Sequence, residues 1–324
     1  MQKFDPLFRN PHAQTIMGHL WKRHASEAIF PVQQRLRQTE PDTWILVESQ
    51  HPAGAPAGEI VMVHGMEGSG QSNYMRGLSF AALAAGYAAS RFNLRACGGT
   101  ERLCRTLYHA GLTSDLLAVL REFQGEDRAP VWLVGFSLGG NVVLKLAGEL
   151  GETAGRLIRG VCAISAPLDL AACTRRLASP ENRLYERRFL REMRARAYRT
   201  GRYTAADFAG IRSLIEADDR ITAPSFGFGN AANYYRTQSA IHYLPDIRVP
   251  TLLIQARDDV FIPFETYASA AISRNPRIKL VITGHGGHLG FIGRNPHRFW
   301  MDHAVLDWIG GQNATGMPAG SHAR

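Results

Sequence analysis

A serine flanked by glycines carries the strongest chemical signal in the sequence. The segment Gly135-Phe136-Ser137-Leu138-Gly139 reads G-x-S-x-G, and it lies between an apolar run at 131–134 and a helical pattern at 138–150. This strand–turn–helix context is typical of a nucleophile elbow, whose turn is too tight for side chains two residues either side of the serine. We therefore interpret Ser137 as a nucleophile. A chance pair of glycines at an ordinary turn is the second interpretation.

A serine hydroxyl is a poor nucleophile unless a base accepts its proton and a third group orients that base. In proteins whose nucleophile lies in such an elbow, the acid comes next along the chain and the histidine comes last. Asp258 and Asp259 follow an apolar run at 251–256, and either could serve. We prefer Asp259, because an acid four residues before a proline, here Pro263, recurs at this loop. Asp258 is then a loop or supporting carboxylate.

Two histidines follow the last apolar run, at 279–283, within the glycine-rich segment Gly284-His285-Gly286-Gly287-His288. Flanking glycines would let this loop project an imidazole over Ser137, so we assign His288 as the base. His285 is the competitor, and its ordinary interpretation is a loop histidine.

Acyl transfer also requires hydrogen-bond donors for a tetrahedral oxyanion. One donor should be the backbone amide of Leu138, directly after the nucleophile. The other should come from the glycine-rich loop at 64–70, where the amide of Met66 can face the site. A plain glycine turn is the alternative for that loop. Because all four pieces occur in the expected chain order, the sequence predicts a Ser-Asp-His site.

Short apolar runs alternate with helical patterns in the parts of the chain that must hold these residues. This alternation predicts βαβ units and a mostly parallel sheet, whose buried strands read as continuous apolar runs. The expected strands are 44–48, 59–64, 88–93, 131–135, 160–165, 251–256 and 279–283. The expected helices are 74–85, 112–124, 138–150, 264–273 and 296–309.

The strand–helix rhythm stops between residues 165 and 250, where helical patterns occur without a convincing strand. A chain of 324 residues has room for about two domains or for one core with an insertion. We predict a core from residues 1–166 and 245–310, with a helical cap at 167–244. Residues 311–324 are rich in glycine, alanine and polar side chains, and we expect a flexible tail there.

Composition excludes several classes of protein. With 45% hydrophobic and 20% charged residues, the chain is neither disordered, collagen-like nor coiled-coil. No apolar run reaches the ~18 residues of a membrane-spanning helix, and residues 1–21 are too polar for a signal peptide, so we expect a cytoplasmic protein. The four cysteines form no C-x-x-C pair. We expect them to be reduced and mostly buried, and we expect no metal and no cofactor.

Beyond these signals, the chain resembles an α/β-hydrolase of the YheT-like branch, also called the AB hydrolase 4 family. The segments that carry the resemblance are NPHAQTI at 10–16, HGMEGS at 64–69, FNLRACGG at 92–99, YHAG at 108–111, GFSLGGN at 135–141, SAPLDL at 165–170, NRLY at 182–185, ITAP at 221–224 and GHLGF at 287–291. They run almost from one end of the chain to the other.

The resemblance implies a doubly flanked, mostly parallel sheet of about eight strands with an inserted helical cap. It also implies a hydrolase of acyl esters whose nucleophile is Ser137, whose base is His288 and whose acid lies in the Asp258–Asp259 pair. The chain departs from the family pattern at Val260, where a proline is common, and at 95–99, where R-A-C-G-G replaces R-G-C-S-G. The second departure could reshape the pocket.

We therefore expect a carboxylesterase or lipase-like serine hydrolase that acts on a small acyl ester or lipid-like substrate. A thioesterase, acyltransferase or phospholipase on the same triad is an alternative. Another is a hydrolase-fold binding protein without turnover. An epoxide hydrolase or dehalogenase would need aspartate in place of Ser137.

Positive charge is concentrated in one part of the predicted cap. The formal net charge is +9, and residues 175–203 hold ten arginines against three glutamates. In that segment Tyr185, Phe189, Met193 and Ala197 recur every four residues, which predicts an amphipathic helix. We favour a helix packed on the core with a solvated basic face. Contact with an anionic lipid or an anionic substrate is the second interpretation. No recognised motif supports nucleic-acid binding, and we expect none.

Overall fold

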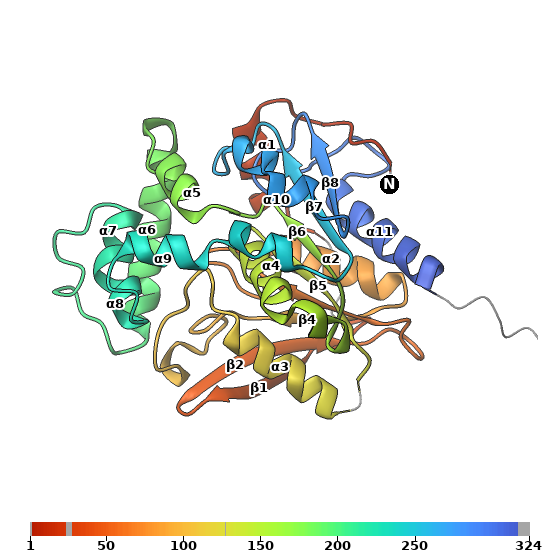
Figure 1. Cartoon of the computed structure of the whole chain (residues 1–324), viewed down its shortest axis with the longest axis horizontal. Coiled ribbons are helices and arrows are strands. Elements are labelled where there is room, and N and C mark those ends of the chain that lie inside the picture. Colours follow the sequence, from red (N-terminus) through yellow and green to blue (C-terminus); the bar gives the residue numbers. More distant parts are fainter. Residues whose placement is uncertain (1, 24–27, 127, 317–324) are drawn as a thin grey trace, which may run out of the picture.

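The computed structural model describes residues 2–23, 28–126 and 128–316, and its centre is one eight-stranded sheet with helices on both faces (Figure 1). The strand order is β1-β2-β4-β3-β5-β6-β7-β8. β2 runs antiparallel to both β1 and β4, and the other neighbours are parallel. The strands are β1 Gln33–Glu40, β2 Thr43–Gln50, β3 Glu59–Val63, β4 Ala88–Phe92, β5 Val131–Phe136, β6 Ile158–Ile164, β7 Thr251–Ala256 and β8 Ile278–Thr283.

The two faces of the sheet bury alternate residues of the same strands, because successive side chains of a strand point to opposite sides. Ile60 and Met62 of β3 pack with α2 and α11, whereas Val61 and Val63 pack with α3 and α4. The helices of the core are α1 Pro11–Leu20, α2 Asn73–Ala84, α3 Ser114–Gly125, α4 Leu138–Leu150, α10 Ala270–Ser273 and α11 Trp300–Gly316. No helix among the described residues is long and apolar enough to cross a bilayer.

The segment between β6 and β7 contains helices and no strand in its described residues, as predicted (Figure 1). These helices stand together to one side of the sheet, at the left of the view. They are α5 Leu170–Leu177, α6 Arg183–Arg199, α7 Leu214–Ala217, α8 Ala223–Ser225 and α9 Ala231–Gln238, with a π-helical turn at Asp218–Thr222. The boundaries of the cap at 167 and 244 remain a prediction.

The predicted basic helix is α6, and its packing agrees in part with the expected stripe. Met193 and Ala197 are buried, and Tyr185 and Phe189 are partly buried against the core. The expectation of a solvated basic face is wrong for Arg196, whose side chain is buried.

Seven strands are predicted from the sequence to within two residues at each end, and β1 is the exception. Its sequence, QQRLRQTE, has no regular apolar alternation, because it is an edge strand that is mostly exposed. Backbone pairing with β2 holds it, together with ion pairs from Arg37 to Glu122 and Glu126.

Three helical regions also differ from expectation. Helix α1 is not among the predicted helices, although Asn10 caps it by accepting a hydrogen bond from the Ala13 amide and Pro11 occupies its first turn. The helix expected at 264–273 is a 3₁₀ turn, Phe264–Ala268, followed by the short α10.

The third difference concerns the predicted tail at 311–324. Helix α11 begins at Trp300 and continues to Gly316, so residues 311–316 are helical rather than part of a tail. The Asn313 side-chain amide donates a hydrogen bond of 2.9 Å to the Tyr87 hydroxyl, which ties this end of α11 to the core. Residues 317–324 lie outside the described residues.

All four cysteines are buried and free, as predicted. Burial raises the pKa of Cys97 to about 12, so its thiol stays protonated near neutral pH. Among the described residues, no group of three or more His, Cys, Asp or Glu side chains is arranged to hold a metal ion.

Candidate active site

Ser137 lies in the turn between β5 and α4 and has strained backbone angles, φ 49° and ψ −122°. A positive φ is uncommon for a residue other than glycine and is maintained only where the surroundings enforce it. A Cβ atom at Gly139 would lie 2.3 Å from the Val63 carbonyl oxygen, and one at Gly135 would lie 2.4 Å from the Gly139 carbonyl oxygen. Both glycines are therefore required for the close packing of this turn.

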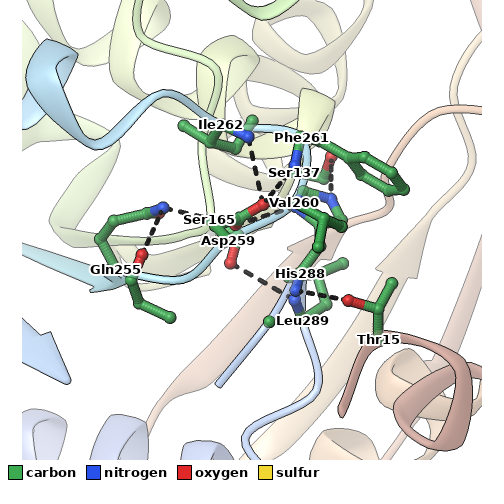
Figure 2. Close-up of polar contacts among 12 residues, drawn as sticks. Thr15, Ser137, Ser165, Gln255, Asp259, Val260, Phe261, Ile262, His288 and Leu289 are labelled. Carbon is green, nitrogen blue, oxygen red and sulfur yellow. Dashed lines mark hydrogen bonds and ion pairs between the residues drawn. The ribbon is translucent and has the colours of Figure 1, made fainter. Parts of the chain in front are cut away.

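The structure brings Ser137, His288 and Asp259 together in one chain of contacts (Figure 2). Ser137 Oγ lies 2.9 Å from His288 Nε2. His288 Nδ1 lies 3.1 Å and 3.0 Å from the two carboxylate oxygens of Asp259. Asp259 Oδ1 also accepts hydrogen bonds from the backbone amides of Phe261 and Ile262, at 2.9 Å and 3.1 Å. These donors fix the orientation of a buried carboxylate that faces the imidazole.

Asp258 has different partners. One of its oxygens accepts a hydrogen bond of 2.9 Å from the Gly287 amide, and the other lies 3.1 Å from His285 Nδ1. Asp258 and His285 are thus on the same loops as the three residues of the contact chain, but they pair with each other and not with Ser137.

Thr15 supports His288 and was not singled out as a site residue in the sequence. Its hydroxyl oxygen accepts a hydrogen bond of 2.9 Å from the His288 amide (Figure 2) and donates one of 2.8 Å to the Pro11 carbonyl. A Cβ atom at Gly287 would lie 2.4 Å from the same carbonyl oxygen. The histidine loop therefore packs closely on α1. The only sequence signal for Thr15 was its place in the NPHAQTI segment of the family resemblance.

Met66 and Leu138 line the same cavity as Ser137. Within the described part of the chain neither amide donates a hydrogen bond to another residue. Flanking contacts hold the Met66 loop: the Gly65 amide donates to the Tyr74 hydroxyl at 3.0 Å. Their role as oxyanion donors remains a prediction.

His64, at the start of the same loop, has a structural role. Burial lowers its pKa to about 4, so the ring is neutral near pH 7. Its Nε2 accepts a hydrogen bond of 3.0 Å from the Leu94 amide, and Nδ1 donates one of 2.7 Å to the Gly65 carbonyl. The neutral tautomer that these partners select ties the loop to the segment after β4.

A cavity of about 320 Å³ joins these groups, between the core and the cap. Its walls are largely apolar and come from both parts of the molecule; they include Leu170, Leu177, Phe189, Met193, Leu214 and Phe261. Ile16 and Leu20 of α1 line it as well, and both are exposed to solvent. Because these two side chains both line the cavity and are exposed to solvent, the cavity opens beside α1.

Asp218 is an acidic group in this mostly apolar wall. It begins the π-helical turn, and the Tyr235 hydroxyl donates a hydrogen bond of 2.7 Å to its carboxylate. Burial raises the pKa of Asp218 to about 6. Because the buried surroundings disfavour the ionised carboxylate, ionisation of Asp218 near neutral pH lowers the stability of the fold.

Comparison with known proteins identifies the family. Residues 60–300 match the model of the alpha/beta hydrolase family. YheT of Escherichia coli (strain K12), a proposed esterase, is 34% identical over 320 residues, which cover 95% of this chain and 93% of YheT. Phospholipase ABHD3 of Mus musculus is 27% identical over 240 residues, which cover 72% of this chain and 58% of that protein. The chain belongs to the alpha/beta-hydrolase family, in its YheT-like branch, as the sequence predicts.

Solved structures agree on the fold. The Pyrococcus furiosus esterase Pf2001 superposes with a TM-score of 0.60 over 90% of this chain and 97% of its own, at 18% identity. Est1E from Butyrivibrio proteoclasticus gives 0.58 over 87% and 99%, at 14% identity. At these identities the likeness extends to the fold alone.

Proposed function

We propose that this protein is a carboxylic ester hydrolase that cleaves acyl esters through an acyl-enzyme on Ser137. One observation carries the proposal: Ser137 Oγ, His288 and the Asp259 carboxylate form an unbroken chain of contacts of 2.9–3.1 Å. Membership of the alpha/beta-hydrolase family supports ester hydrolysis as the class of reaction. The chemistry needs neither a metal nor a cofactor.

In the acylation step, Ser137 Oγ attacks the ester carbonyl carbon while His288 Nε2 takes the hydroxyl proton. The new C–O bond moves the carbonyl electron pair onto oxygen, where the Met66 and Leu138 amides donate hydrogen bonds to it. Collapse of this intermediate breaks the bond to the alcohol oxygen, which receives the proton from His288. Asp259 stabilises the imidazolium and keeps Nδ1 protonated.

In the deacylation step, a water molecule gives a proton to His288 Nε2 and attacks the acyl carbon. The second tetrahedral intermediate uses the same two amides. When it collapses, Ser137 Oγ leaves with the proton from His288, and the carboxylic acid is released. The enzyme returns to its starting state.

The apolar cavity favours an ester with a lipid-like part. Relatives support this class: one is named a phospholipase, and another, 25% identical over 74% of this chain, is the monoacylglycerol lipase of Saccharomyces cerevisiae. This chain spans 56–58% of those two proteins. A thioesterase, acyltransferase or phospholipase would use the same three residues, and a substrate profile separates them.

The test is hydrolysis of a p-nitrophenyl ester series, from acetate to laurate, by wild type, Ser137→Ala and Ser72→Ala. Ser72 lines the same cavity, but its hydroxyl oxygen accepts a hydrogen bond from the Ser69 amide. We expect turnover by wild type and Ser72→Ala and none above background by Ser137→Ala. Equal turnover by Ser137→Ala would reject the proposal. Absence of turnover in wild type with every ester of the series would also reject it and would favour a binding protein.

We further propose that the open end of the cavity contacts an anionic lipid surface. Contacts of His12 with Tyr185 and of His19 with Arg188 bring α1 alongside the N-terminal half of α6. The exposed side chains of this surface combine apolar and cationic groups: Ile16 and Leu20 on α1, and Leu184, Arg187 and Arg191 on α6. This combination is typical of helices that lie at a membrane interface.

A further inference from the structure

One buried ion pair ties the loop of the Met66 amide to the cap. Glu67 directly follows Met66, and Arg196 lies on α6. Arg196 Nε lies 3.0 Å from Glu67 Oε2, and Nη2 lies 2.6 Å from Oε1. The two side chains are only 4% and 6% exposed. This parallel, two-point geometry fixes both the direction and the distance of the carboxylate.

Tyr108 completes the arrangement around Glu67. Its hydroxyl accepts a hydrogen bond of 2.9 Å from the Glu67 amide and donates one of 3.0 Å to Glu67 Oε1. The Arg196 guanidinium carbon lies 4.3 Å from the centre of the Tyr108 ring. Glu67 has a φ of 54°, which a residue with a side chain adopts only when its surroundings hold it there. Its backbone and its carboxylate are therefore both held, and so is the peptide between Met66 and Glu67. The Met66 amide lies one peptide earlier in the same tight loop, next to the Gly65 amide that donates to the Tyr74 hydroxyl.

Stability alone does not account for this ion pair. The free-energy cost of removing two charges from water usually offsets the attraction between them, so a buried ion pair is weak evidence for a stabilising role. Arg196 Nη1 is also buried without a hydrogen-bond partner among the described residues, which adds to the cost. All three side chains line the cavity that contains Ser137.

The same helix provides a natural comparison. Arg199, three residues further along α6, pairs with Glu101 at 3.0 Å and also joins the cap to the core. Those side chains are 58% and 13% exposed, and neither residue is among those that line the cavity. The Glu101–Arg199 pair thus also joins an arginine of α6 to a glutamate of the core, but it lies away from the cavity.

We propose that Arg196 is a positioning residue for the oxyanion site. Through Glu67 and Tyr108 it holds the Met66 amide where the oxyanion forms, so full activity requires α6 to be docked on the core. This inference rests on the proposed ester hydrolysis. Because an error of about 1 Å in a catalytic donor can reduce the rate about 100-fold, a modest shift of the loop is sufficient for a large effect.

The experiment compares Arg196→Met, Glu67→Gln, the double variant and Arg199→Met, with kcat, KM and thermal stability measured on a short soluble ester. We expect Arg196→Met to lower kcat about 10- to 100-fold with KM changed less than about 3-fold, and to lose stability because Glu67 is left unpaired. The double variant should regain stability, since no buried charge is left alone, while its kcat stays at least about 10-fold low. Arg199→Met should retain wild-type kcat.

Two results would overturn the positioning role. One is a double variant with wild-type kcat, because activity would then follow stability. The other is a kcat for Arg196→Met no lower than that of Arg199→Met. Both results presuppose Ser137-dependent turnover by the wild type. If that turnover is missing, the proposed function fails, and the inference fails with it.

Discussion

The core and the cap contribute to this site in different ways. Ser137, Asp259 and His288 follow the ends of β5, β7 and β8, and the amides of Phe261 and Ile262 hold the Asp259 carboxylate. The cap supplies none of these three residues. The cap instead contributes Arg196, which pairs with Glu67 of the core. It also contributes Asp218, which lines the cavity.

The two parts of the molecule should therefore respond differently to substitution. Changes in the strand-end loops should alter the chemical step itself. Changes in the cap should alter the geometry of the loop at Met66, stability or surface binding while leaving the contacts among Ser137, His288 and Asp259 in place. The predictions below test that separation in order of decreasing effect.

The largest effect is expected at Asp259, with its neighbour as the matched control. Asp259→Asn should lower kcat/KM about 10⁴-fold, because an amide no longer keeps His288 in the tautomer that accepts the serine proton. Asp258→Asn should lower kcat/KM less than about 10-fold, since Asp258 contacts His285 and Gly287. Steady-state kinetics on one soluble ester checks both, and a larger loss at Asp258 would reverse the assignment.

The second effect is a stability change in the cap. Folding raises the pKa of Asp218 from 3.8 to about 6, so the folded state holds this proton more tightly than the unfolded state. Stability therefore falls as pH rises from about 4 to about 6 and stays lower above that range. Asp218→Asn should be more stable than wild type at pH 8, by up to about 3 kcal/mol, and should match it at pH 3.

Urea unfolding of Asp218→Asn at both pH values measures this gap. Asp219→Asn is the control, because Asp219 is an exposed residue of the same turn, and the hydrogen bond that its carboxylate accepts from the Ala231 amide can be accepted by asparagine as well. A gap of equal size at pH 3 and pH 8 would show that proton binding at Asp218 is not its source.

A smaller effect is expected at Thr15, on the core side of the comparison. Thr15→Val removes the acceptor of the His288 amide and should lower kcat about 3- to 10-fold. Thr15→Ser keeps the hydroxyl and should restore wild-type kcat. If Ser and Val variants are equally slow, the methyl packing of Thr15 matters rather than its hydrogen bond.

The smallest effect on chemistry is expected on the exposed face of α6. Arg187→Gln with Arg191→Gln should leave kcat/KM on soluble esters within about 2-fold and should weaken binding to phosphatidylglycerol vesicles about 30-fold, at about 1 kcal/mol per arginine. Co-sedimentation with phosphatidylglycerol and phosphatidylcholine vesicles measures this. Equal binding of the variant and wild type to both would reject the lipid contact.

The sequence predicted the core well because its signals are local. A G-x-S-x-G between a strand and a helix, and polar residues after later strands, require only short-range rules and the knowledge that parallel strands end at one edge. Those rules gave only a preference for Asp259, from its spacing to Pro263, because adjacent residues share most local signals. Their separate hydrogen-bond partners distinguish them in the structure.

Contacts between distant parts of the chain were beyond sequence reasoning. Thr15 meets His288 across 273 residues, and Arg196 meets Glu67 across 129. In the sequence, Arg196 looked like one more residue of a solvated basic face. Only the packing of α6 reveals that it is buried against a carboxylate.

The most direct test of the account is covalent labelling with a fluorophosphonate, with the modified peptide mapped by mass spectrometry in wild type, Ser137→Ala and His288→Ala. We predict one phosphonylated residue, Ser137, with labelling lost in Ser137→Ala and strongly slowed in His288→Ala. Labelling of another residue, or labelling of Ser137 at an unchanged rate without His288, would contradict an activated serine at this elbow.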